Sequence, residues 1–145
     1  MADKLETVIR NYIEALEKRD LDRALSFFTD DATWYTSEGV FKGKEELKKY
    51  TSWMFETVKD LKFADDGIGI VVQGSKAVYQ HTWSGINEGT DIKVESVCTY
   101  EFRGDKCKSH WTINDRLLIA KQAATGFIAR KAVGSILKQI EKGLH

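Results

Sequence analysis

The sequence predicts an α+β domain, a curved antiparallel sheet with helices packed on one side. Apolar residues recur at helical spacing in the first third of the chain, and helical spacing returns over residues 115–142. Strand-like runs separated by turn residues fill the stretch 66–114. The length of 145 residues fits one domain with its own core.

Three N-terminal helices are expected, over residues 4–18, 21–28 and 43–58, each with a stripe of apolar side chains. Asp20 precedes the second helix, where aspartate is a preferred N-cap. Residues 31–39 contain Thr, Trp and Tyr followed by a Gly, which is typical of a short strand and a turn.

Four further strands are expected, over residues 66–73, 76–84, 91–102 and 106–114. Two-residue turns are expected at 74–75, 88–89 and 104–105. If so, three rows cross neighbouring strands: Tyr79, Cys98 and Trp111; His81, Ser96 and Ile113; Trp83, Val94 and Asp115. These rows would face the helices, because residues of one row share a face. The opposite, polar face would carry Gln80, Thr82, Glu95, Thr99, Glu101, Lys108 and His110.

The two cysteines, Cys98 and Cys107, do not make a disulfide framework. The expected register separates them by ~13 Å, beyond disulfide reach. We therefore expect reduced thiols and a cytoplasmic protein. No CxxC or HExxH motif occurs and the three histidines are far apart in sequence, so neither a metal site nor another cofactor is expected.

The charges balance overall but not along the chain. From Arg116 to the end there are six basic residues and one acidic residue, a net charge of +5, so the preceding residues carry −5. The basic residues are spread along a helical pattern, which favours a solvated helix face over a nucleic-acid site. No apolar run approaches the ~20 residues that cross a bilayer, and the N-terminus lacks the pattern of a secretory signal.

Several stretches resemble the SnoaL-like group of the nuclear transport factor 2-like superfamily. They are "NYIEALEKRDLDRALSFFTDDATWYTSEGVFKGKEEL", the hairpin "GINEG" and "YEFRGDKCKSHWTINDRLLIAKQ". The resemblance covers about residues 5–123. It implies a cone in which a strongly bent sheet wraps over helices around an apolar pocket, and it implies a homodimer. The pocket-lining residues expected on this basis are Trp34, Thr36, Trp53, Tyr79, Trp83, Ser96, Cys98, Tyr100, Trp111 and Ile113.

The resemblance also extends to ketosteroid isomerases, in which a tyrosine and a protonated acid polarise a carbonyl while an aspartate moves the proton. Tyr12 matches the tyrosine, but the base position falls on Thr36 and the second donor on Cys98. Neither can replace a carboxyl group, so steroid isomerisation is rejected. SnoaL-like cyclases have a late acid/base aspartate, which Asp115 matches, whereas their hairpin histidine falls on Asn87.

Three residues are candidates for catalysis, each with a structural alternative. Asp115 is a general acid/base or the N-cap of the last helix. His81 is a polar pocket group or a hydrogen-bonded core histidine, and Tyr12 is a carbonyl donor or a core tyrosine.

We expect a domain over residues 1–125 with a helical extension over 126–145. Its pocket would bind a small hydrophobic or aromatic molecule, with acid/base proton transfer of the cyclase or isomerase type as its chemistry. The alternative is a non-catalytic binding or dimerisation module. A cavity of ~300 Å³ or more with convergent polar groups would favour the enzyme. The apolar stripe of the extension is expected to pack over the open end of the cone or on a dimer partner, rather than on a membrane.

Overall fold

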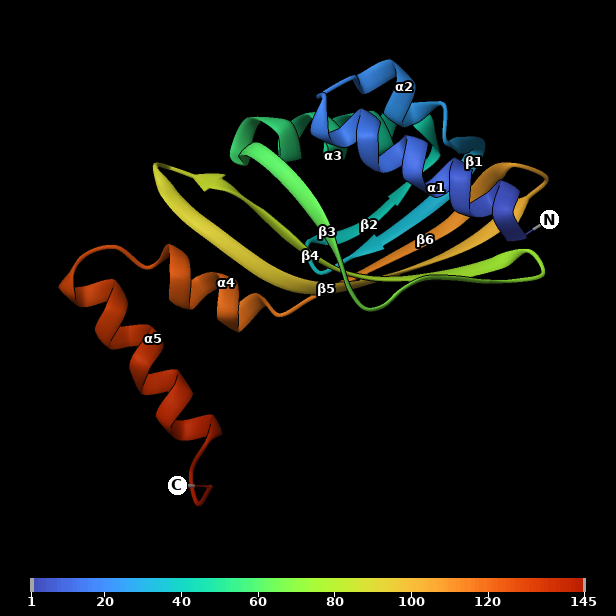
Figure 1. The fold of residues 1–145 in the computed structure, drawn as a ribbon. Coiled ribbons are helices and arrows are strands. Elements are labelled where there is room, and N and C mark those ends of the chain that lie inside the picture. The colour runs from blue at the N-terminus through green and yellow to red at the C-terminus, as the bar shows by residue number, and fades with distance from the viewer. Residues whose placement is uncertain (1, 145) are drawn as a thin grey trace.

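The computed structural model describes residues 2–144, which form the expected α+β domain. Figure 1 shows a strongly curved sheet with helices over its concave side and further helices beyond one end of it. The concave helices are α1 (Ala2–Glu17), α2 (Leu21–Leu25) and α3 (Gly43–Thr57). Asp20 caps α2 as expected, since its side chain accepts a hydrogen bond from the Arg23 N–H.

The sheet has six strands in the order β2-β1-β6-β5-β4-β3. They are β1 (Phe28–Thr36), β2 (Gly39–Lys42), β3 (Lys59–Gln73), β4 (Lys76–Asn87), β5 (Thr90–Arg103) and β6 (Lys106–Asn114). Several expectations are wrong in detail. The helix expected over residues 21–28 ends at Leu25, and Phe28 already begins β1. β3 begins seven residues earlier than the pattern indicated, and β1 pairs with β6 in parallel, so the sheet is mixed rather than wholly antiparallel.

The three expected two-residue turns are confirmed. Pairing resumes on both sides of residues 74–75, 88–89 and 104–105. Glu88 and Gly89 both have positive φ, as a tight hairpin turn requires. The β4–β5 register therefore agrees with expectation, with Tyr79 opposite Cys98 and the other two rows in place on these strands.

The register of β6 differs by one residue. Phe102 lies opposite Cys107, as expected, but Glu101 lies opposite Ser109, so Lys108 is an extra residue that bulges out of the ladder. Because side chains alternate between the two faces, one extra residue reverses the face of every side chain beyond it. The rows predicted for this strand, which placed Trp111, Ile113 and Asp115 inside, are therefore wrong.

The reversal brings three polar side chains inside and leaves two apolar ones outside. His110 is buried, and Thr112 and Asn114 lie opposite the inward residues Cys98 and Ser96. Trp111 and Ile113 are instead 49% and 59% exposed on the outer face.

The C-terminal segment forms two helices, α4 (Arg116–Ala123) and α5 (Phe127–Ile140). The chain bends between them at Gly126, whose φ of 82° is readily adopted only by glycine. α5 points away from the cone (Figure 1), so it does not cover the open end in the single chain. Among the described residues, no helix is both long and apolar enough to cross a membrane.

Candidate functional site

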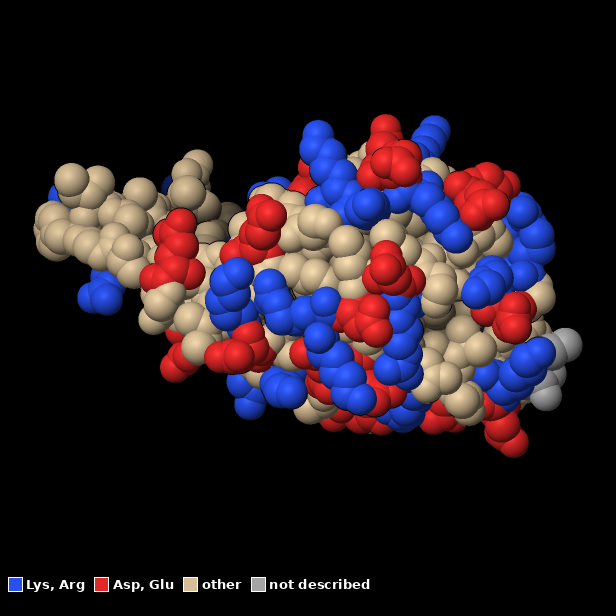
Figure 2. Space-filling view, turned by 90° about the horizontal axis from the view of Figure 1, so that it is seen from above, with Lys and Arg blue, Asp and Glu red and all other residues tan. Residues whose placement is uncertain are grey.

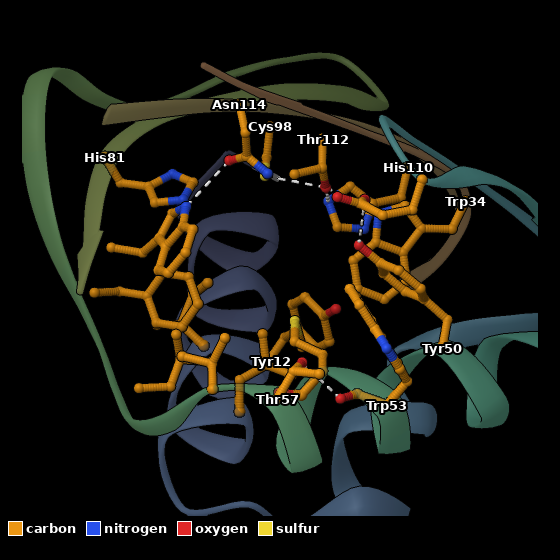
Figure 3. A pocket seen from close by; sticks show the side chains of 18 of the residues that line it. Tyr12, Trp34, Tyr50, Trp53, Thr57, His81, Cys98, His110, Thr112 and Asn114 are labelled. Atoms are coloured by element: carbon orange, nitrogen blue, oxygen red, sulfur yellow. Dashed lines mark hydrogen bonds between the residues drawn. The ribbon is translucent and has the colours of Figure 1, made fainter. Parts of the chain in front are cut away.

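A cavity of about 210 Å³ lies between the inner face of the sheet and helices α1 and α3. Most of its lining is aromatic or aliphatic. Figure 3 shows that Cys98, Thr112 and Asn114 lie along its sheet side, and that Tyr12 approaches from the helix side. His81 and His110 lie at opposite ends.

Two tryptophans of the lining donate hydrogen bonds to the polar groups on the sheet side of the cavity. The Trp34 indole N–H donates to the Thr112 hydroxyl at 2.8 Å, and the Trp83 indole N–H donates to the Asn114 side-chain oxygen at 3.1 Å. The Ser96 hydroxyl donates to the same Asn114 oxygen. Since a buried indole N–H needs an acceptor, these two tryptophans stabilise polar side chains on the inner face of β6.

His110 is held inside an aromatic stack. Its ring lies 4.5 Å from the Trp34 ring and 4.6 Å from the Tyr100 ring, centroid to centroid. Burial lowers the pKa of His110 to about 3, so the imidazole is neutral at physiological pH. Nε2 lies 3.3 Å from the Thr112 hydroxyl, whereas Nδ1 is buried without a hydrogen-bond partner among the described residues.

Tyr12 is the second side chain with an unpaired polar atom. Its ring stacks on Phe27 at 4.2 Å, which fixes its direction, and its buried hydroxyl has no hydrogen-bond partner in the described chain. Burial raises the pKa of Tyr12 well above 10, so the hydroxyl keeps its proton and can donate it in a hydrogen bond.

His81 lies on β4 at the opposite end of the cavity from His110. Its Nδ1 is 3.2 Å from the Tyr79 carbonyl oxygen, which can only accept a hydrogen bond. Nδ1 therefore carries the proton of the neutral ring and Nε2 keeps a free lone pair. Burial lowers the pKa of His81, which favours this neutral form.

The only acidic or basic side chain among the lining residues, histidines aside, is Glu38. It is exposed on the β1–β2 turn and accepts a hydrogen bond of 3.0 Å from the Tyr50 hydroxyl. Ile119 of α4 forms part of the cavity wall. Gln122, also of α4, hydrogen-bonds both the N–H and the carbonyl of Lys93 on β5. α4 is thereby attached at the margin of the pocket.

Seven of the residues selected from the sequence line the cavity: Tyr12, Trp34, Trp53, His81, Trp83, Cys98 and Tyr100. Six others do not: Thr36, Tyr79, Ser96, Trp111, Ile113 and Asp115. The Thr36 hydroxyl closes the β1–β2 turn by bonding to Gly39. The Tyr79 hydroxyl donates to Asp65, which is paired with Arg10.

Asp115 is exposed and caps α4. Its carboxylate accepts a 2.9 Å hydrogen bond from the Leu118 N–H. It lies one residue beyond Asn114, the last β6 residue that reaches the cavity. The geometry therefore matches the capping alternative and does not bring Asp115 together with Tyr12 and His81.

Sequence reasoning missed His110, Thr112, Asn114, Glu38 and Tyr50 as lining residues. Apolar-inward alternation favoured Trp111 and Ile113, and no local signal marks the bulge at Lys108. The sequence contained only an indirect signal for these residues. Trp34 and Trp83 were expected to face inward, and a buried indole N–H needs a hydrogen-bond acceptor nearby.

Within residues 2–144, no three His, Cys, Asp or Glu side chains gather closely enough to hold a metal ion. Cys98 lies 3.6 Å from the Thr112 hydroxyl, and burial raises the pKa of this thiol to about 11. Apart from Glu38 at the exposed margin, the polar groups of the cavity are thus neutral donors and acceptors, suited to hydrogen bonding and to proton transfer by an imidazole.

The family model of the SnoaL-like domain matches residues 9–110, more than half of the chain. The chain belongs to the SnoaL-like family. The match includes β1, β4 and β5 and most of the cavity lining, whereas α4 and α5 lie beyond it. No curated protein sequence matches this SnoaL-like chain significantly.

Solved structures share the fold at low sequence identity. A ketosteroid isomerase-like protein from Catenulispora acidiphila, in complex with trimethylamine, has 12% identity and a TM-score of 0.74, covering 82% of this chain and 93% of that one. A proposed SnoaL-like polyketide cyclase from Jannaschia has 13% identity and a TM-score of 0.76, with coverages of 87% and 95%. TerC, co-crystallised with polyporic acid, has 18% identity and a TM-score of 0.73, with coverages of 82% and 97%.

Proposed function

We propose that the chain binds a neutral, mainly apolar molecule of one or two rings in the cone cavity, with one ligand oxygen accepting a hydrogen bond from Tyr12. The observation that carries this proposal is a pair of buried, unpaired polar atoms, the Tyr12 hydroxyl and His110 Nδ1, on two residues that line a mainly apolar cavity. An unpaired buried donor costs about 1–3 kcal/mol, so a ligand that satisfies it gains that energy.

The volume limits the size of the ligand. A cavity of about 150 Å³ accepts benzene, so 210 Å³ leaves room for one ring with substituents or a small bicycle. The same volume lies below the ~300 Å³ set above as the lower bound for an enzyme pocket. Four-ring ligands therefore do not fit this state of the cavity.

The charges limit the chemistry of the ligand. Both histidines of the lining have lowered pKa values and are neutral, and Glu38 is at the exposed margin. A charged ligand would lose its hydration without gaining an opposite charge inside, which costs several kcal/mol. The structures of two neighbours with trimethylamine and polyporic acid support occupancy of this fold by small molecules.

A matched pair of ligands tests the proposal. Acetophenone and ethylbenzene share a phenyl ring and a two-carbon side chain, but only acetophenone has a carbonyl oxygen. We expect acetophenone to bind more tightly, by about two- to twelvefold for one hydrogen bond. Trp34, Trp53 and Trp83 line the cavity, so their fluorescence reports binding directly.

Tyr12→Phe is the decisive variant, because it removes the hydroxyl and keeps the ring stacked on Phe27. It should abolish the preference for acetophenone while leaving ethylbenzene binding unchanged. Equal affinity of the unaltered protein for the two compounds would reject Tyr12 as the anchor. Failure of both compounds to bind would reject the ligand class.

A second candidate function is proton transfer at the carbon next to a carbonyl, with His81 in the role that the sequence suggested for Asp115. The observation that favours it is the Nδ1–Tyr79 contact, which leaves Nε2 of a neutral imidazole as a base. Nε2 would take the carbon-bound proton while Tyr12 donates to the carbonyl oxygen, and the same proton or another would return to carbon.

Exchange of the acetophenone methyl protons for deuterium in heavy water, followed by NMR, tests this chemistry without knowledge of the natural substrate. If the protein accelerates this exchange, His81→Gln should remove the acceleration and Asp115→Asn should retain it. That result would support His81 as the base. Binding without accelerated exchange would favour the non-catalytic alternative. We also propose that the chain forms a homodimer, which sedimentation of the purified protein tests.

A further inference from the structure

α5 has an apolar surface without a partner in its own chain. None of its residues is buried, and Ile136 and Ile140, which share one face of the helix, are 50% and 66% exposed. Among the described elements it packs chiefly on α4. A 14-residue helix is marginally stable by itself in water, so an exposed apolar stripe of this size indicates a binding surface.

The side chains of α5 are divided between two faces. At 100° per residue, Val133, Ile136 and Ile140 lie within about 60° of one another, whereas Lys131 and Lys138 lie on the opposite side. Figure 2 shows the far end of this extension, at the left, covered mainly by uncharged residues, while both signs of charge cover the cone densely.

A second unpartnered apolar surface crosses the outer face of the sheet. We call it the outer row. It consists of Val40, Tyr35, Trp111, Thr99, Val78 and Val71, one residue from each strand in successive pairings. Val40, Trp111 and Val71 are about half exposed, and the Tyr35 ring stacks on Trp111 at 3.9 Å. Five strand spacings give the row a length of ~24 Å.

The two surfaces match in length, and the parts of the chain that carry them have opposite net charges. The 14 residues of α5 span ~21 Å, close to the length of the outer row. The chain from Arg116 onward carries a net charge of +5, and the remainder carries −5. Attraction between tail and body therefore accompanies the apolar fit. α5 points away from the sheet of its own chain (Figure 1). The sheet that its apolar face contacts would therefore belong to another molecule.

We propose that α5 of one copy lies across the outer row of a second copy, and that the second copy returns the same contact. This interface places a helix between the two sheets and excludes direct contact between their outer rows. It deepens the proposed homodimer by assigning the contact to α5, and it is independent of what the cavity binds.

Disulfide trapping between two variants tests the contact. Ile136→Cys in one copy and Thr99→Cys in another should give a covalent heterodimer when the mixed proteins are mildly oxidised. Lys138→Cys, on the opposite face of α5, is the matched control and should give little heterodimer. Native Cys98 and Cys107 are buried and should not compete. A disulfide within one chain carrying both Ile136→Cys and Thr99→Cys, with none between copies, would overturn the proposal.

Sedimentation equilibrium separates this contact from a direct sheet-to-sheet dimer. Ile136→Asp should weaken dimerisation at least about tenfold, because it places an unpaired carboxylate in the contact. Ser135→Asp makes the same charge change outside the apolar stripe and should keep the dimer. A dimer that Ile136→Asp leaves intact would show that a homodimer exists without α5. A monomeric protein that binds vesicles of phosphatidylcholine and phosphatidylserine through α5 would assign the helix to membranes and reject the proposal.

Discussion

The indole N–H of Trp34 on β1 donates a 2.8 Å hydrogen bond to the hydroxyl of Thr112 on β6, inside the cavity. The two residues are 78 positions apart in sequence. The contact requires Thr112 to point inward, which the bulge at Lys108 permits. Through Thr112, the bond also reaches His110 Nε2. It therefore fixes the polar end of the cavity as well as the register of β6.

Thr112→Val should lower the free energy of unfolding by about 1–3 kcal/mol. Valine keeps the shape of threonine but leaves the buried Trp34 N–H without an acceptor. Thr33→Val, on the outer face of the neighbouring strand β1 and outside the outer row, is the matched control and should change stability little. Urea unfolding measures both. An equal effect of the two substitutions would contradict the assigned role of the bond.

Acidification should destabilise the protein below pH 6.5, before most carboxylates titrate. The folded-state pKa of His110 is lowered to about 3 from the usual 6.5, so between these values the unfolded chain binds a proton that the folded chain does not. The contribution of His110 is therefore constant above pH 6.5 and decreases as the pH falls. The slope for one such histidine is at most about 1.4 kcal/mol per pH unit.

His110→Gln should flatten the stability curve between pH 6.5 and about 5, a window chosen above the ordinary range of carboxyl groups. His81, whose pKa is also lowered, should account for part of the remaining slope. Thermal unfolding across this pH range measures the effect. A His110→Gln variant with an unchanged slope would show that His110 is not the titrating group.

Neither cysteine should react with a thiol reagent in the folded protein. Cys98 and Cys107 are both free and buried, and burial raises their thiol pKa values to about 11 and about 12. Since the thiolate is the reactive form, we expect labelling only after unfolding. Time-resolved labelling with Ellman's reagent, with and without denaturant, measures this. Rapid labelling of one thiol in the native state would contradict the burial of that residue.

Asp115→Ala should destabilise the protein by about 1 kcal/mol, whereas Asp115→Asn should cost little, because asparagine also caps helices. Neither substitution should alter ligand affinity, since Asp115 does not line the cavity. Paired unfolding and binding measurements check both statements. Loss of proton-transfer activity in Asp115→Asn with unchanged stability would restore Asp115 as the acid/base.

The local features of the fold could be predicted from the sequence because each depends on residues close together in the chain. Helical periodicity located α1 and α3, Asp20 marked the start of α2, and the glycines at 74, 89 and 104 located the three hairpin turns. The turn at residues 88–89 sets the β4–β5 register, and this register places His81 and Cys98 on the inward face.

The candidate site depends on two features of strand pairing that no local sequence pattern indicates. β1 pairs in parallel with β6, and a bulge at Lys108 shifts β6 by one residue. The sequence alone determined the α+β class, the helices, the turns and seven of the lining residues. Only the tertiary structure decided that His110, Thr112 and Asn114 face the cavity in place of Trp111 and Ile113. The physical reason is that side chains alternate along a strand, so one extra residue exchanges its faces, and the indole N–H groups of Trp34 and Trp83 stabilise the polar alternative.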